Sequence, residues 1–161
     1  VCKDIDGVLN FLMQAKIEPG NVNCVQISPT IQATKSNFTR AHGGKMPAYL
    51  EYFDNSDKYD VIYDQIQSEQ STRFYKKRNR NMIMIVNEEI EILPNFKWMT
   101  LGQIKQLMTI DNLVNMDTRT VLSGIPFITH GLEESDVNEL KTYFTDVPTY
   151  NSLFRTSPME S

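Results

Sequence analysis

Alternation of apolar and polar residues marks the first part of the chain as extended structure. The apolar positions are Leu9, Phe11, Met13, Ala15 and Ile17, followed by Val25, Ile27 and Ile31. Pro19 and Gly20 separate the two groups and occupy the second and third positions of a typical type II turn. The pattern therefore predicts a long β-hairpin over residues 7–34.

Further strands and capped helices are expected beyond the hairpin. Residues 60–67 alternate and 82–86 form a short apolar run, so both predict strands, while the polar, basic residues 68–80 indicate a short helix or an ordered loop. Thr100 and Gln103 form a capping box for a helix with an apolar face. That face consists of Leu101, Ile104, Leu107 and Met108. Asp117 can cap a shorter helix ending near Gly124, and Ser135 can cap a last helix.

These elements predict an α/β fold, more specifically an α+β mixed sheet with flanking helices. The 161 residues suit a single domain. We expect one module over residues 1–147 and a loosely ordered tail over 148–161.

Charge and composition narrow the function. The net charge of −4 argues against a general nucleic-acid binder, and no apolar stretch is long enough to span a membrane. Cys2 and Cys24 are expected to be reduced thiols of a cytoplasmic protein. Residues 73–80 carry five basic side chains and no acid. Such a block in an acidic chain favours a local anion site.

Three segments carry candidate chemistry. Residues 39–45 place His42 beside two glycines, residues 73–81 hold the basic block, and residues 111–120 combine amides, carboxylates and a guanidinium. A surface turn, a solvated helix face and a capped turn are the respective alternatives. Motifs for metal or for nucleotide phosphate are incomplete, so no cofactor is expected. The aromatic residues Tyr49, Tyr52, Phe53 and Trp98 could stack on a base or pack in the core.

Seven segments in order resemble a known family. They are residues 6–16 (DGVLNFLMQAK), 18–21, 28–37, 42–44 (HGG), 67–70, 77–82 (KRNRNM) and 111–122 (DNLVNMDTRTVL). From residue 1 to about 127 the chain is similar to the NDP-hexose 2,3-dehydratases. The short pieces are weak alone, whereas the ordered set is specific.

The resemblance implies an activity, a fold and partners. Members remove water across C2 and C3 of dTDP-4-keto-6-deoxyglucose or a related sugar, in deoxysugar and antibiotic biosynthesis. It also implies a Nudix-like sandwich without the Nudix catalytic box, and no metal or redox cofactor. Because family members carry two modules, we expect a homodimer or pairing with a second module.

The chemistry requires a base, an acid, a donor to the enolate oxygen and a diphosphate clamp. His42 and Glu51 are our candidates for base and acid, in either order, and the next choices are Asp117, a tyrosine or the other module. The candidate substrate-binding residues are Gln32 and Thr34 for the sugar; Arg40, Asn115 and Arg119 for the enolate or hydroxyls; and Arg78 and Arg80 for the diphosphate. Asp117 is a further substrate-binding candidate. A non-catalytic nucleotide-sugar-binding module is the alternative, and a Nudix-type hydrolase is a third.

Overall fold

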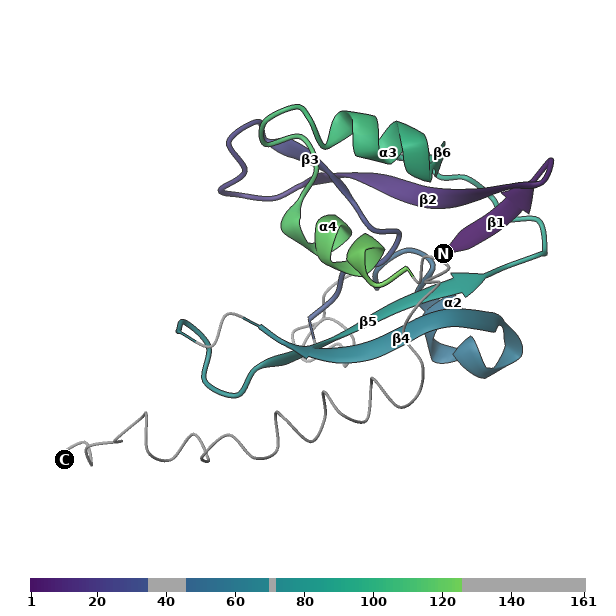
Figure 1. Cartoon of the computed structure of the whole chain (residues 1–161), viewed down its shortest axis with the longest axis horizontal. Helices are drawn as coiled ribbons and strands as arrows, with labels where there is room; N and C mark the ends of the chain where they lie inside the picture. The colour runs from purple at the N-terminus through teal and green to yellow at the C-terminus, as the bar shows by residue number, and fades with distance from the viewer. Residues whose placement is uncertain (35–45, 70–71, 126–161) are drawn as a thin grey trace, which may run out of the picture. The chain divides into compact units, whose positions relative to one another are not determined.

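A computed structural model describes residues 1–34, 46–69 and 72–125 (Figure 1). The strands are β1 (Cys2–Ile5), β2 (Val8–Ile17), β3 (Val25–Ser28), β4 (Asp60–Ser68), β5 (Arg78–Ile85) and β6 (Phe96–Thr100). The helices are α2 (Leu50–Asp54), the 3-10 turn η1 (Ser56–Lys58), α3 (Leu101–Leu107) and α4 (Met116–Ser123).

Strand β2 organises the sheet. The strand order is β3-β2-β1-β5-β4, and β6 pairs with β2 outside this path. Asn10 and Phe11 pair with both β1 and β6, so these two strands lie on opposite edges of β2. All pairings are antiparallel except that of β1 with β5, at Cys2 and Ile85. The sheet is therefore mixed, which confirms the expected fold class. The Nudix-like detail stays a prediction.

Two turns fix the register of β2. Asp6 and Gly7 have φ angles of 53° and 77°, typical of the type I′ turn of a tight hairpin. At the other end, the amide of Asn21 donates to the carbonyl of Glu18 at 3.1 Å, and Gly20 has a φ of 114°. The predicted type II turn is therefore confirmed. The hairpin is also present, but its second strand ends at Ser28 and not at residue 34. However, β3 pairs only with Gln14–Ile17, because the first half of β2 is taken by β1.

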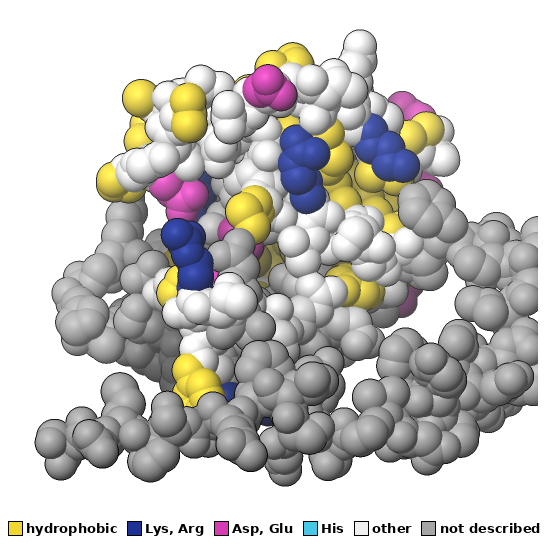
Figure 2. Space-filling view, turned by 60° about the vertical axis from the view of Figure 1, so that its left-hand side comes forward, with side chains coloured by type: hydrophobic (Ala, Val, Ile, Leu, Met, Phe, Trp, Pro, Cys, Tyr) yellow, Lys and Arg dark blue, Asp and Glu magenta, His cyan; other side chains and the backbone are white. Residues whose placement is uncertain are grey.

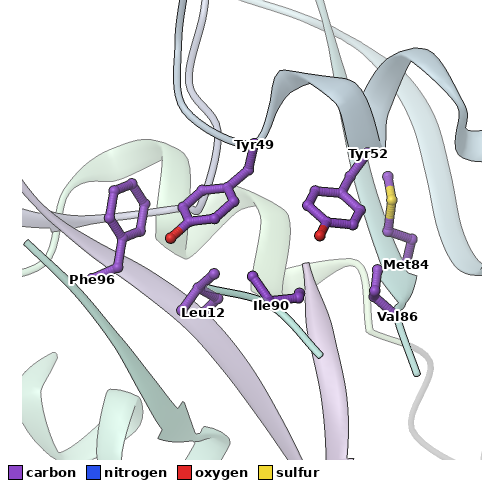
Figure 3. Close-up of a cluster of buried hydrophobic side chains, with 7 residues drawn as sticks. All are labelled: Leu12, Tyr49, Tyr52, Met84, Val86, Ile90 and Phe96. Atoms are coloured by element: carbon purple, nitrogen blue, oxygen red, sulfur yellow. The ribbon is translucent and has the colours of Figure 1, made fainter. Parts of the chain in front are cut away.

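Side chains of β2 are buried on both faces of the sheet. Phe11 and Met13 join a cluster with Ile104 of α3 and Leu122 of α4, whereas Leu12 joins a second cluster on the α2 side. Figure 3 shows the second cluster, which contains Leu12, Tyr49, Tyr52, Met84, Val86, Ile90 and Phe96. Neighbouring strand residues point to opposite faces, so helices cover both sides of the sheet.

Tyr49 anchors the second cluster. Its ring meets Phe96 edge to face at 4.8 Å (Figure 3), and its hydroxyl donates to the Glu91 carbonyl and accepts from the Leu93 amide. The hydroxyl thereby satisfies two backbone groups of the segment before β6. Tyr49 and Tyr52 are thus core residues rather than stacking platforms for a base.

Several predicted boundaries hold and others are wrong. The Thr100–Gln103 capping box and the strand over residues 60–67 are confirmed. The strand predicted at residue 82 begins at Arg78, because the polar residues before it pair with β4. Helix α4 is capped by Asn115 and not by Asp117, since the Asn115 side chain accepts the Thr118 amide. The helix predicted at Ser135 and the boundary at residue 147 lie outside the described residues. In the described part, no helix is long and apolar enough to cross a membrane.

Gly124 is required by a close approach. It ends α4, and a methyl group added there would overlap the ring of Tyr63. We expect Gly124→Ala to lower the free energy of unfolding by about 1–3 kcal/mol, the usual cost of overpacking. Urea denaturation measures the change.

Gly102 provides the matched control. It lies in α3, and a methyl group there would meet only Thr100 Oγ1 at 3.8 Å. Gly102→Ala should stabilise the protein by about 0.5–1 kcal/mol, as expected for a helical glycine. Equal effects at the two glycines would contradict the steric explanation.

Candidate functional site

A cavity of about 670 Å³ lies between β2 and β5. Strand β1 separates these two strands only as far as Phe11 on β2 and Ile85 on β5. The cavity begins where this pairing stops. It is lined by β2, residues 29–34, α2, β5 and α4. Helix α4 contacts both β3 and β5 and so lies between the two halves of the sheet (Figure 1).

Apolar side chains from both core clusters form much of the cavity wall. Phe11, Met13, Ile83 and Leu122 come from the α3–α4 face, and Leu12 comes from the α2 face. These residues exclude water from part of the cavity, which strengthens electrostatic interactions inside it.

Charged side chains stand around this wall. The described lining has four cations and three acids, a net charge of +1. They are Lys16, Lys77, Arg78 and Arg80, against Glu18, Glu69 and Asp117. Since the whole chain carries −4, this positive excess favours an anionic ligand. Figure 2 shows separate Lys and Arg side chains among hydrophobic ones on one face of the molecule.

Two ion pairs occur among these charges. Lys16 Nζ lies 2.7 Å from Glu18 Oε1, and Lys77 Nζ lies 2.7 Å from Glu69 Oε2. The first pair follows the end of β2, and the second joins the two sides of the β4–β5 hairpin. Both flank Asp117 closely enough to affect its ionisation.

Asp117 is the acid that the site leaves uncommitted. It lies in the first turn of α4, is half-buried, and makes no hydrogen bond with any described residue. Burial raises the pKa of its carboxyl group above the usual 3.8. Glu18 and Glu69 raise this pKa further, whereas Lys16 and Lys77 lower it. A carboxyl group in this position can exchange a proton with a bound molecule.

Asn115 and Gln32 meet beside Asp117. Asn115 is 6% exposed, and its Nδ2 donates to Ser28 Oγ at 2.9 Å and to Gln32 Oε1 at 3.0 Å. Its Oδ1 accepts the Thr118 amide at 2.8 Å. Asn115 itself is therefore occupied by the protein, while Gln32 lines the cavity. The predicted polar strand face does not extend to Gln32, because β3 ends at Ser28, but Gln32 still lines the cavity.

The two arginines predicted for the diphosphate differ in their partners. Arg80 forms a double hydrogen bond with Asp64, at 2.8 and 2.6 Å, and lies over the Phe53 ring. The guanidinium of Arg78 has no partner among the described residues. Both line the cavity, and Arg78 is the cation that is available to an added anion.

Other predicted site residues lie elsewhere. His42 and Arg40 fall outside the described residues, so their roles stay predictions. Glu51 is exposed on α2 and does not line the cavity, although Leu50 and Phe53 of the same helix do. Arg119 is also absent from the lining, and its guanidinium donates to the carbonyls of Val114 and Met108. Thr34 lines the cavity, and its role in sugar binding stays a prediction.

The sequence reasoning missed the charges around Asp117. Lys16 and Glu18 stand two positions apart, a spacing that places both side chains on one side of an extended segment. That signal was visible, but the distant pair Lys77–Glu69 required knowledge of the β4–β5 register. Over residues 1–34, 46–69 and 72–125, no three His, Cys, Asp or Glu side chains group as metal ligands.

Comparison with known proteins identifies the class. The family of NDP-hexose 2,3-dehydratases matches residues 1–125, so the chain belongs to this family. Among the relatives are dTDP-4-dehydro-6-deoxy-α-D-glucopyranose 2,3-dehydratases of Saccharopolyspora spinosa and Amycolatopsis orientalis. They are 47% and 49% identical over 89% and 91% of this chain. A third, from Streptomyces violaceoruber, is 49% identical over 77% of this chain. The aligned region covers 34%, 31% and 28% of these relatives, so the chain spans about a third of their length.

The raised pKa of Asp117 makes the stability of the fold depend on pH. The folded state binds this proton more tightly than the unfolded state, so ionised Asp117 destabilises the fold at neutral pH. We expect Asp117→Asn to stabilise the protein at pH 7. The gain should shrink as the pH falls and vanish well below 3.8, where Asp117 is protonated in both states. Urea denaturation at pH 3 and pH 7 tests this. Asp111→Asn, at an exposed position in the preceding turn, is the control.

Proposed function

We propose that this chain is a module of a sugar 2,3-dehydratase acting on dTDP-4-keto-6-deoxyglucose or a related NDP-4-ketohexose. The half-buried, uncommitted carboxyl group of Asp117 in a net-positive cavity is the observation that carries the proposal. The names of the three relatives support the substrate class.

The reaction needs one proton removed and one hydroxyl released. The C4 ketone acidifies the proton on C3, and a base takes that proton while the ketone oxygen gains negative charge. The electron pair then forms the C2–C3 double bond, and the C2 hydroxyl leaves as water after an acid protonates it. Neither step formally requires a metal or a redox cofactor.

Asp117 is our candidate for the base. It lies in the cavity, and its raised pKa makes the carboxylate a stronger base than an exposed aspartate. His42 is our candidate for the acid that assists the C2 hydroxyl. Glu51 was the other sequence candidate, and its exposed position outside the cavity favours Asp117 in its place.

Arg78 is our candidate for the diphosphate clamp, with Arg80 in support. A guanidinium matches the geometry of phosphate oxygens and can bind two of them at once. Arg78 has no partner among the described residues and can bind phosphate in this way, whereas Arg80 already forms an ion pair with Asp64.

The assembly and setting of the module are further proposals. Since the chain spans about a third of its relatives, we propose that it works beside a second module or a second copy. We also propose a cytoplasmic site of action in antibiotic deoxysugar biosynthesis.

Two substitutions separate the removal of the C3 proton from the protonation of the C2 hydroxyl. In the native protein carrying this chain, Asp117→Asn should lower kcat by about 10²–10⁴-fold, as expected for a lost general base. It should also abolish exchange of solvent deuterium into C3. His42→Gln should lower kcat but retain that exchange, because the base remains.

The controls decide between enzyme and binding module. Asp111→Asn should behave as the wild type, because Asp111 is exposed and does not line the cavity. A wild-type protein that binds the nucleotide sugar without C3 exchange would indicate a non-catalytic binding module. Normal turnover of Asp117→Asn would exclude Asp117 as the base.

The diphosphate assignment predicts a graded loss of affinity. Arg78→Ala should weaken dTDP-sugar binding by about 1.5–3 kcal/mol, the scale of a hydrogen bond to a charged group. Arg80→Ala should weaken it less. Arg73→Ala is the matched control, since Arg73 belongs to the same basic block but does not line the cavity. Calorimetric titration measures the three affinities, and equal losses at Arg78 and Arg73 would contradict the assignment.

A further inference from the structure

The amide of Asn115 can adopt only one orientation. Its Oδ1 faces the backbone amide of Thr118, which can only donate a hydrogen bond. The nitrogen Nδ2 must therefore face the other way, toward Ser28 and Gln32. Its two protons are both used there. The N-cap of α4 thus fixes the direction of every hydrogen bond that Asn115 makes.

This orientation fixes Gln32 in turn. Because Nδ2 of Asn115 donates, the Gln32 atom that meets it must be the acceptor Oε1, at 3.0 Å. The Gln32 nitrogen Nε2 then points away from Asn115. It makes no hydrogen bond with any residue that the structure describes, and Gln32 lines the cavity. Gln32 therefore brings two N–H donors to the cavity lining that have no acceptor among the described residues.

The position of Gln32 at the end of a hydrogen-bond series strengthens its N–H groups as donors. The Thr118 amide belongs to the first turn of α4, the positive end of its helix. It donates to Asn115, Asn115 donates to Gln32, and Gln32 can donate to a ligand. Hydrogen bonds in such a series strengthen one another.

The series starts at the helix that carries the candidate base. Asn115 precedes Asp117 by two residues, and the residue that caps the helix of Asp117 is the same one that holds Gln32. We propose that Gln32 Nε2 donates to the C4 oxygen of the ketosugar as it becomes an enolate, and that Asn115 is the positioning residue for this donor. The inference rests on the proposed dehydratase function.

The fit is chemical as well as geometric. Removing the C3 proton places negative charge on the oxygen attached to the adjacent carbon, C4. A base and an oxyanion donor for this reaction must therefore lie at the same cavity. Asp117 and Gln32 both line it, and Asn115 links Gln32 to the start of the helix that carries Asp117. A neutral amide can stabilise the enolate by hydrogen bonding without adding a positive charge to the cavity.

Substitution of Gln32 tests the donor. Gln32→Met keeps the length and removes both N–H groups. In the native protein we expect kcat to fall by about 10²–10³-fold, as for a lost oxyanion donor, with KM little changed. A higher KM with an unchanged kcat would show that Gln32 binds only the ground state and would overturn the proposal.

Asn115→Ser tests the positioning role. Serine still caps a helix, but it cannot reach Gln32 Oε1. We expect kcat to fall by about tenfold or more in the wild-type background and by less than about threefold in Gln32→Met. Equal losses in both backgrounds would show that Asn115 does not act through Gln32 and would overturn this part. If Asn115→Ser does not fold, Asn115→Asp retains the cap and serves in the same cycle.

A spectroscopic measurement keeps the test independent of turnover. Infrared spectra of a dTDP-4-keto-6-deoxyhexose labelled with ¹³C at C4 report hydrogen bonding to that oxygen. The C4 stretch of the bound sugar should lie lower in the wild type than in Gln32→Met, and equal frequencies would overturn the proposal.

The controls separate this inference from the function on which it rests. Thr100→Ala removes the cap of α3, away from the cavity, and should lower the melting temperature without changing kcat. Absence of turnover by the wild type would refute the proposed function itself. Wild-type turnover combined with an unaffected Gln32→Met would refute only the assignment of Gln32.

Discussion

The position of β2 is the constraint on which the other elements depend. It pairs with β1 and β3 along one edge and with β6 along the other, and it buries side chains on both faces. Because β1 leaves β2 after Phe11, β2 and β5 continue without a strand between them. The same arrangement therefore builds the core at one end of the sheet and the cavity at the other.

Helix α4 carries the candidate base, Asp117, into this cavity. Its eight residues have little intrinsic stability as a helix, so tertiary contacts and its cap must hold it. The Asn115 cap ties it to β3 through Ser28, and Thr118 Oγ1 donates to the Ile27 carbonyl. These contacts fix where Asp117 enters the cavity. The stability of the helix start and the placement of the candidate base thus depend on the same few hydrogen bonds.

Local sequence patterns are sufficient to predict the elements that depend on residues close together in the sequence. The Thr100–Gln103 box and the Pro19–Gly20 turn follow from residue types at short spacing, and both are present. The start of β5 was missed because polar strand residues become strand only by pairing with β4. The cap of α4 was misassigned because Asn115 and Asp117 are both good N-cap residues. Only the contact with Ser28, 87 positions away, distinguishes them.

In the candidate site, too, the sequence identifies residue types, whereas their partners depend on contacts between distant segments. Gln32, Arg78 and Asp117 were identified as polar residues of the right chemistry, yet the sequence could not rank them. The structure ranks these candidates by showing which side chains already have protein partners. Arg80 is hydrogen-bonded to Asp64, and Arg119 is hydrogen-bonded to backbone carbonyls. Among the residues that the structure describes, Arg78, Asp117 and the nitrogen of Gln32 have no hydrogen-bond or ion-pair partner, and all three residues line the cavity. In the proposed function these groups are the diphosphate clamp, the base and the oxyanion donor, three of the four groups that the elimination needs, and each lies in a different part of the fold.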